Sequence, residues 1–144
     1  MLNPDKIPNE NLKKAASLSH MDRWAEHVSL DEIPPPDLVV AGSVAVTRNG
    51  NRCGKGEGYS DLEYAILIEL GHKAVPVVTT VHPLQLVNSF PTDPHDLPLS
   101  VIATYNEIIE VDNPPKAPNG ISWEQLSDND LDEMPVLKEL KNSK

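Results

Sequence analysis

Apolar positions gather in a few short runs along this chain, and the pattern within each run predicts an element. Asp37 to Thr47 reads DLVVAGSVAVT, a valine-rich run long enough for a buried strand, and Gly42 in its middle indicates a bulge or a close backbone approach. Ala74 to His82 predicts a second buried strand. Two shorter strands are expected near Val101 to Thr104 and Glu107 to Val111.

Spacing and caps predict a helix between the two buried strands. Ser60 and Glu63 are spaced as a capping box at its start, and Gly71 is expected to end it. Four apolar residues recur at helical spacing and predict its core face: Leu62, Ala65, Ile66 and Leu70. The order strand, loop, helix, strand is that of a βαβ unit. The fold class is therefore α/β, with a mostly parallel sheet in a three-layer α/β/α arrangement.

The segments on either side of this core are expected to be helical. Asn9 to Ser17 and Met21 to His27 predict two short helices, and the tail predicts two more near Trp123 to Leu126 and Pro135 to Leu140. Within a single domain, we expect three parts: a helical lead-in over 1–36, an α/β core over 37–112 and a C-terminal extension over 113–144.

The net charge of −10 argues against general nucleic-acid binding, because phosphate backbones are held by Lys and Arg. Arg48, Arg52 and Lys55 nevertheless lie within eight positions, which indicates either a discrete site for a small anion or a solvated turn. A single cysteine, Cys53, permits no internal disulfide and fits a reducing compartment, so we expect a cytoplasmic protein. No run is apolar enough for a membrane helix or a signal peptide.

The densest chemistry lies in the loop RCGKGEGYSD, Arg52 to Asp61, where every second position from Gly54 to Gly58 is glycine. Glycines allow positive φ angles, so several backbone N–H groups can point into one hollow in front of the helix. The loop fits neither the dinucleotide-binding fingerprint nor the Walker loop, in which Gly-Lys precedes Ser or Thr. Phosphate binding and a purely structural glycine turn both remain open. Tyr59 could stack on a flat ligand or cover the start of the helix.

Three further groups of residues have weaker signals. Asp93, His95 and Asp96 could ligate Mg²⁺ beside a phosphate, although an Asx-type turn among the prolines is the simpler interpretation. His82 and Gln85 favour a polar contact at the end of a strand over a catalytic base. A lone cysteine without a paired histidine motif is most simply a packing residue.

The run NGNRCGKGEGYSD, Asn49 to Asp61, resembles the R-x-G-x-G-x-G-Y-Y-D signature of the 5-formyltetrahydrofolate cyclo-ligase family. The resemblance includes the preceding strand from Asp37, the glutamine stretch VHPLQLV and the segment FPTDPHDLP, and it extends from about residue 37 to the C-terminus. GKGEGYSDLEYA and the tail GISWEQL are similar to the branch of methenyltetrahydrofolate synthetase domain-containing proteins.

This resemblance implies ATP- and Mg²⁺-dependent closure of 5-formyltetrahydrofolate to 5,10-methenyltetrahydrofolate, in which ATP phosphorylates the formyl oxygen before N10 attacks. By position, Asp61 and Asp96 match the family's metal-binding aspartates. The residues that would contact ATP and the folate-like substrate are Arg52, Gly54, Lys55, Gly56, Glu57, Gly58 and Tyr59. The resemblance assigns no catalytic residue.

Three departures from the family pattern modify this expectation. Glu57 stands where lysine is common, Ser60 replaces a second tyrosine, and the family's N-terminal half is expected to be missing. An incomplete sheet would leave an open edge for a homo-oligomer or a complementing chain. The alternative function is a non-catalytic module that binds a nucleotide, RNA or protein through the same loop.

Overall fold

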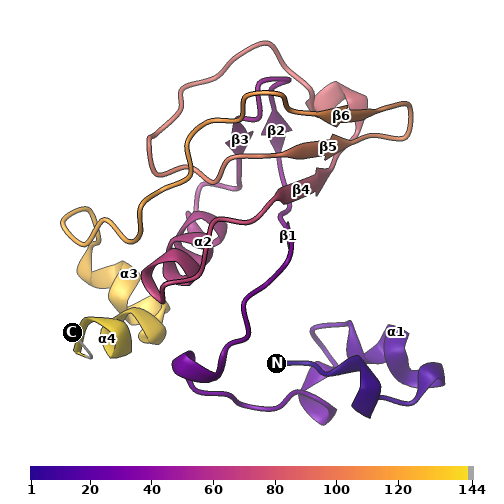
Figure 1. The fold of residues 1–144 in the computed structure, drawn as a ribbon, viewed down its shortest axis with the longest axis vertical. Helices are drawn as coiled ribbons and strands as arrows, with labels where there is room; N and C mark the ends of the chain where they lie inside the picture. Colours follow the sequence, from indigo (N-terminus) through magenta and orange to yellow (C-terminus); the bar gives the residue numbers. More distant parts are fainter. Residues whose placement is uncertain (143–144) are drawn as a thin grey trace. The chain divides into compact units, whose positions relative to one another are not determined.

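The computed structural model describes residues 1–142. The chain divides into two compact units, Met1–Pro35 and Pro36–Lys144 (Figure 1). Residues 143 and 144, the last two of the predicted C-terminal extension, lie outside the described part. The division into lead-in, core and extension stays a prediction.

The first unit consists of short helical turns. Asn9 to Ser17 was predicted as a helix, and helical turns run through η2 and α1 from residue 9 to 15. The second predicted helix, Met21 to His27, is wrong beyond its first turn, because Trp24 at φ −127° leaves the helical conformation. Ala15 and Ile7 are the buried apolar residues of this unit. Its elements are η1 (Pro4–Lys6), η2 (Asn9–Asn11), α1 (Leu12–Ala15), η3 (Met21–Arg23) and η4 (Leu30–Glu32).

A four-stranded mixed sheet forms the centre of the second unit. Its order is β1-β4-β5-β6, in which β4 pairs in parallel with both β1 and β5, while β6 runs antiparallel to β5. The strands are β1 (Val39–Val40), β4 (Val77–Thr80), β5 (Val101–Ala103) and β6 (Ile108–Glu110). Helix α2 (Tyr59–Glu69) lies in the chain between the parallel neighbours β1 and β4. The predicted α/β class is therefore confirmed.

The single strand expected from Asp37 to Thr47 is wrong. The run divides at Gly42 into β1 and β2 (Ala45–Val46), and β2 pairs with β3 (Arg52–Cys53) in a separate hairpin. The chain leaves the main sheet after Ala41, because the carbonyls that follow accept hydrogen bonds from side chains instead of a neighbouring strand. Arg52 Nη1 donates to the Gly42 carbonyl, and Gln85 Nε2 donates to the two carbonyls after it.

Helix α2 ends as predicted but begins differently. Gly71 has φ +88° and donates to the Ile68 carbonyl, and His72 donates to Leu67, which closes the helix C-terminus. The predicted capping box of Ser60 and Glu63 is wrong, because Gly58 at φ +71° is the N-cap and Ser60 already lies in the first turn.

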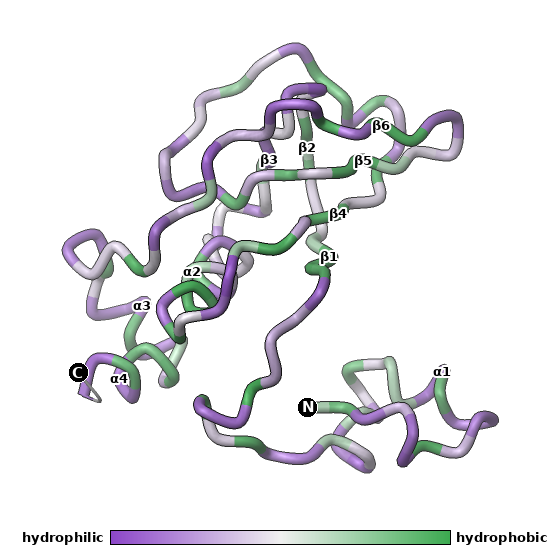
Figure 2. Tube along the Cα trace, viewed as in Figure 1, coloured by the Kyte–Doolittle hydropathy of each residue, from purple (hydrophilic) through white to green (hydrophobic). Residues whose placement is uncertain are grey.

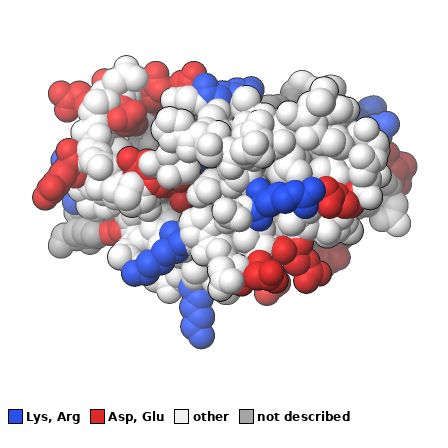
Figure 3. Space-filling view, turned by 90° about the horizontal axis from the view of Figure 1, so that it is seen from above, with Lys and Arg blue, Asp and Glu red and all other residues white. Residues whose placement is uncertain are grey.

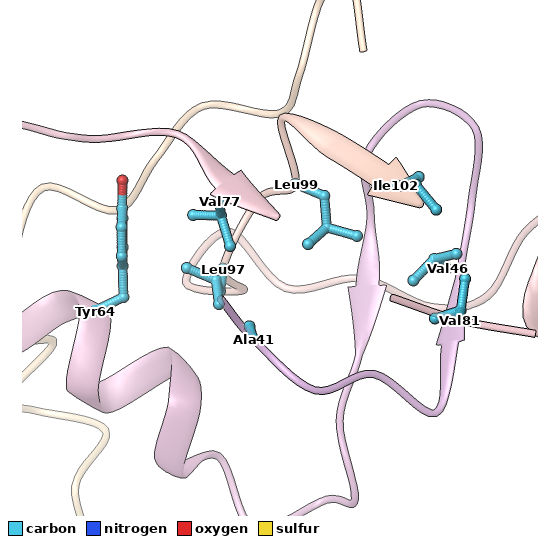
Figure 4. Close-up of a cluster of buried hydrophobic side chains, with 8 residues drawn as sticks. All are labelled: Ala41, Val46, Tyr64, Val77, Val81, Leu97, Leu99 and Ile102. Atoms are coloured by element: carbon cyan, nitrogen blue, oxygen red, sulfur yellow. The ribbon is translucent and has the colours of Figure 1, made fainter. Parts of the chain in front are cut away.

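The core of the second unit is built by side chains from the main sheet, strand β2, helix α2 and the segment before β5. Ala65 and Ile66 are buried as predicted, but the α2 residue in the main cluster is Tyr64, 2% exposed (Figure 4). Its hydroxyl donates to the Val75 carbonyl at 3.1 Å and accepts from the Val75 N–H at 3.2 Å, so the ring is buried with its polar atom satisfied. The cluster consists of Ala41, Val46, Tyr64, Val77, Val81, Leu97, Leu99 and Ile102.

The two faces of the sheet differ in burial. Val77, Thr79 and Ile102 occupy the buried face, and Figure 2 shows the apolar character of β4 and β5 along the chain. Val40 and Ile108, on the opposite face, are 71% and 72% exposed. Parallel sheets usually have both faces covered. The three-layer arrangement stays a prediction.

The first C-terminal helix begins later than expected, and the second begins where it was predicted. The predicted helix near Trp123 to Leu126 is wrong: this segment is a turn, and α3 (Asp128–Glu133) begins after it. Ser127 and Asp130 form the capping box of α3. The predicted last helix is confirmed as α4 (Pro135–Asn142), and a single turn, η5 (Pro83–Gln85), follows β4. In the part of the chain that the structure describes, no helix has the length and apolar character needed to cross a membrane.

Candidate functional site

The glycine loop connects β3 to the start of α2, and its backbone explains the glycines. Gly56 has φ +97° and Gly58 has φ +71°, a left-handed conformation that other residues adopt only with strain. The Gly58 cap provides no side-chain acceptor for the first turn of α2. The N–H groups at the start of this helix can therefore serve an external anion.

Arg52 and Asp61, at the two ends of the loop, form an ion pair beneath it. Arg52 Nη2 donates to both carboxylate oxygens of Asp61, at 2.8 and 2.9 Å, and Nη1 donates to the Gly42 carbonyl at 2.8 Å. The side chains of Arg52 and Asp61 are 3% and 22% exposed. Asp61 Oδ1 also accepts from the Leu97 N–H at 2.8 Å. This pair joins the end of β1, strand β3, helix α2 and the segment before β5.

Gly54 lies against the guanidinium of Arg52. A Cβ atom at position 54 would be 3.1 Å from Nη1 and 3.3 Å from Nη2, tighter than ordinary van der Waals contact. A larger residue would therefore press on the buried ion pair. Among the described residues, Arg52 Nε is buried and has no hydrogen-bond partner.

The first of two hollows beside the loop, here the loop hollow, has a volume of about 400 Å³. Its lining includes the charged side chains of Lys55 and Glu57 and the aromatic ring of Tyr59. Residues 42–44, between β1 and β2, form another part of its wall. Ser43 Oγ bonds to the buried Thr79 hydroxyl at 2.8 Å, which holds that wall to β4. The lining residues are Gly42, Ser43, Val44, Arg52, Gly54, Lys55, Glu57, Gly58, Tyr59 and Ser60.

The second, smaller hollow, here the aspartate hollow, has a volume of about 220 Å³ and contains both predicted metal ligands, Asp61 and Asp96. Asp96 Oδ2 accepts from the Asp93 N–H at 2.7 Å. The other lining residues are Arg52, Cys53, Gly54, Gly56, Gly58 and Pro91. The structure thus brings every residue that the family resemblance assigned to at least one of these two hollows, and Arg52, Gly54 and Gly58 line both.

Asp93 and His95 form a turn, as the simpler interpretation of their spacing predicted. The Asp93 carboxylate accepts from the His95 backbone N–H at 2.9 Å and lies 2.7 Å from His95 Nδ1. Both contacts lower the pKa of the Asp93 carboxyl, and the hydrogen bond from the His95 backbone N–H has the larger effect. Among residues 1–142 no group of three or more His, Cys, Asp or Glu side chains is placed to hold a metal ion.

A further hollow in the second unit, about 640 Å³, is lined by no residue of the glycine loop. It is lined by the 92–95 and 115–123 segments, so it includes Asp93 and His95 but none of the residues that the family resemblance assigned to ATP, substrate or metal. Charge also varies over the surface: on the face shown in Figure 3, Lys and Arg side chains are scattered among Asp, Glu and uncharged residues.

Sequence reasoning missed three residues that line or support the loop hollow. The wall residues Ser43 and Val44 were assigned to a strand interior, although Gly42 beside them indicated an irregularity. Gln85 was predicted only to make a polar contact with His82, and it does, through the His82 N–H at 2.7 Å. Its amide nitrogen also donates to the Ser43 and Val44 carbonyls, at 2.9 and 3.0 Å, and so supports the wall.

Comparison with known proteins identifies the family. The model of the 5-formyltetrahydrofolate cyclo-ligase family matches residues 8–105. The chain belongs to this family. The match begins well before residue 37, so the similarity includes most of the N-terminal unit, which motif comparison had left out.

Among proteins of this family, the chain is similar to methenyltetrahydrofolate synthase domain-containing proteins. It is 39% identical over 142 residues to the mouse protein, covering 96% of this chain and 38% of the relative. Identity to the human protein is 36% over 143 residues, covering 96% of this chain and 37% of the relative. The chain therefore spans well under half the length of the relatives it matches.

Proposed function

We propose that this protein binds Mg-ATP at the glycine loop and uses it to close a 5-formylated tetrahydrofolate to the 5,10-methenyl form. Membership of the 5-formyltetrahydrofolate cyclo-ligase family supports the reaction type. The observation that carries the proposal is the position of the loop. Its left-handed glycines lie before the start of α2, whose Gly58 cap has no side-chain acceptor, with Lys55 in one hollow and two aspartates in the other.

The loop is suited to a phosphate chain. Gly56 and Gly58 would let the chain approach the backbone closely, since a Cβ at either position would meet nothing within 4 Å. The N–H groups of the first turn of α2 and the Lys55 ammonium would stabilise its negative charge. Phosphoryl transfer depends on positioning and on neutralising charge, so such a cradle is suited to this chemistry.

The residues of the aspartate hollow fit a magnesium ion. Asp61 accepts two hydrogen bonds at Oδ1 and one at Oδ2, and Asp96 accepts one at Oδ2. Both carboxylates therefore keep lone pairs for a metal. Mg²⁺ is usually held by one or two carboxylates together with phosphates and water, so a larger ligand cluster is not required. When bound, the ion would neutralise phosphate charge beside the loop.

Calorimetric titration of the protein with Mg-ATP tests the proposal. We expect saturable binding that weakens about tenfold in Lys55→Ala, because one charge-assisted contact to phosphate is lost. Lys116→Ala is the matched control, since Lys116 lines the separate 640 Å³ hollow. Formation of methenyltetrahydrofolate, followed by absorbance with ATP and 5-formyltetrahydrofolate, then tests the reaction.

Each outcome separates the functions. Binding with turnover supports the cyclo-ligase. Binding without turnover would replace it with a non-catalytic nucleotide-binding module on the same fold. If millimolar Mg-ATP does not bind, the proposed nucleotide site is wrong.

We also propose that the sheet associates with a second chain or another copy of this one. Strand β1 is at the end of the strand order, and Val40 on it is 71% exposed. Exposed apolar edge strands favour pairing with another strand. Sedimentation velocity should then show a species larger than 15.8 kDa that dissociates in Val40→Lys. A monomer at all concentrations, with full ATP-dependent turnover, would contradict this.

The expected compartment is the cytoplasm. Cys53 is a free and exposed thiol, which supports a reducing environment.

A further inference from the structure

Tyr59, the first residue of α2, is hydrogen-bonded to a residue of the C-terminal segment. Its hydroxyl donates to Glu133 Oε2 at 2.5 Å, across 74 positions of sequence. Glu133 is the last residue of α3, and the start of that helix is secured by the Ser127–Asp130 capping box. Tyr59 also lines the loop hollow and is 39% exposed, so its ring is accessible to a ligand there.

The surroundings of the Tyr59 hydroxyl are acidic. Its donation to Glu133 is the largest cause of a raised pKa at the phenol, followed by desolvation, and Glu57 and Asp130 contribute further negative charge. Carboxylates repel phosphate, so a phosphate chain in the loop hollow is favoured beside Lys55 and the α2 N-terminus instead. The uncharged part of a nucleotide is then left for the side of the hollow that Tyr59 lines.

We propose that Glu133 positions the Tyr59 ring against the planar base of a nucleotide whose phosphates bind at the glycine loop, which makes the C-terminal segment part of the ligand site. This inference rests on the proposed nucleotide binding and names the group that contacts the base. Aromatic rings stack on bases of any kind, and an oriented ring loses less freedom when it does so.

Glu133 lies outside the part of the chain that the family model matches, residues 8–105. The methenyltetrahydrofolate synthase domain-containing relatives, by contrast, match over 96% of the chain. The Tyr59–Glu133 contact therefore joins the region matched by the family model to a C-terminal segment outside it. The relatives align with this chain over nearly its whole length.

Two ligands separate base recognition from phosphate recognition: Mg-ATP and Mg-tripolyphosphate, which lacks base and sugar. In Glu133→Ala we expect affinity for Mg-ATP to fall about fivefold, the effect of one hydrogen bond, while affinity for Mg-tripolyphosphate stays the same or rises. Glu133→Gln, which keeps a neutral acceptor, should restore most of the affinity for Mg-ATP. Asp132→Ala is the matched control, since this neighbouring carboxylate bonds to Lys138 instead.

A spectroscopic measurement tests the contact itself. Absorbance titration of the phenols should show one tyrosine with a lower pKa in Glu133→Ala than in the wild type, and no such change in Asp132→Ala. Tyr59→Phe identifies the signal, because the protein has three tyrosines.

Equal loss of affinity for both ligands in Glu133→Ala would indicate a merely structural role and overturn the inference, as would no loss for either. Unaltered tyrosine titration would overturn it as well. If the wild type binds neither ligand, the proposed function fails and so does the contact between Tyr59 and a base. The tyrosine titration still shows in that case whether Glu133 holds Tyr59.

Discussion

The base and the tip of the glycine loop each carry one basic and one acidic side chain, but the basic side chain is buried at the base and exposed at the tip. At the base, Arg52 is 3% exposed and is bound to Asp61 by two hydrogen bonds. At the tip, Lys55 and Glu57 are exposed and line the loop hollow. One short motif therefore contains a cation that organises the fold and a cation that is available to a ligand.

Burial explains the difference. Removing an ion from water is costly, and a buried guanidinium is tolerated only when its partners are fixed and well aligned. Arg52 meets this condition through Asp61 and the Gly42 carbonyl. An exposed lysine needs no such partner and remains free to neutralise phosphate. A charged residue in a binding motif can therefore stabilise the fold, while its neighbour is exposed to a ligand.

The largest expected effect comes from Asp61→Ala at the base. This change leaves the buried Arg52 charge without its carboxylate and should lower the free energy of unfolding by about 3 kcal/mol. Urea denaturation measures this, with Asp96→Ala as the control in the same hollow, where less than about 1 kcal/mol is expected. Equal losses in the two variants would show that the ion pair does not stabilise the fold.

A smaller effect is expected from Gly54→Ala. The new methyl group would lie 3.1 Å from Arg52 Nη1, and this overpacking should cost about 1–2 kcal/mol in the free energy of unfolding. Gly42→Ala is the control, because a Cβ there meets nothing within 4 Å, and its effect should stay within about 0.5 kcal/mol. If thermal unfolding ranks the two variants the other way, the guanidinium is not held as tightly as the structure shows.

The smallest effect on stability is expected at the tip. Lys55→Ala, which should weaken Mg-ATP binding, is expected to change the free energy of unfolding by less than about 0.5 kcal/mol, since the side chain is exposed. Urea denaturation and calorimetric titration of the same Lys55→Ala preparation give its stability and its affinity for Mg-ATP. A marked loss of stability would remove the distinction between base and tip.

Local sequence signals predicted much of the second unit. Strands β4, β5 and β6 and the glycine stop of α2 follow from apolar runs and from Gly71, whose signals need no distant partner. The start of α2 was misplaced because Ser60 has the right spacing to Glu63, yet a left-handed Gly58 already caps the helix. The valine run from Asp37 was taken as one strand because nothing within it shows that Arg52 and Gln85 bond to its central carbonyls.

The sequence by itself determined the family, the α/β class and the glycine loop with its two candidate metal aspartates, because these depend on residue types at short, regular spacings. Only the tertiary structure decided that Arg52 is buried against Asp61, that Asp61 and Asp96 share a hollow, and that Glu133 reaches Tyr59 across 74 positions. Such contacts depend on how distant segments pack together. Burial and hydrogen bonding then set which charges are structural and which remain available.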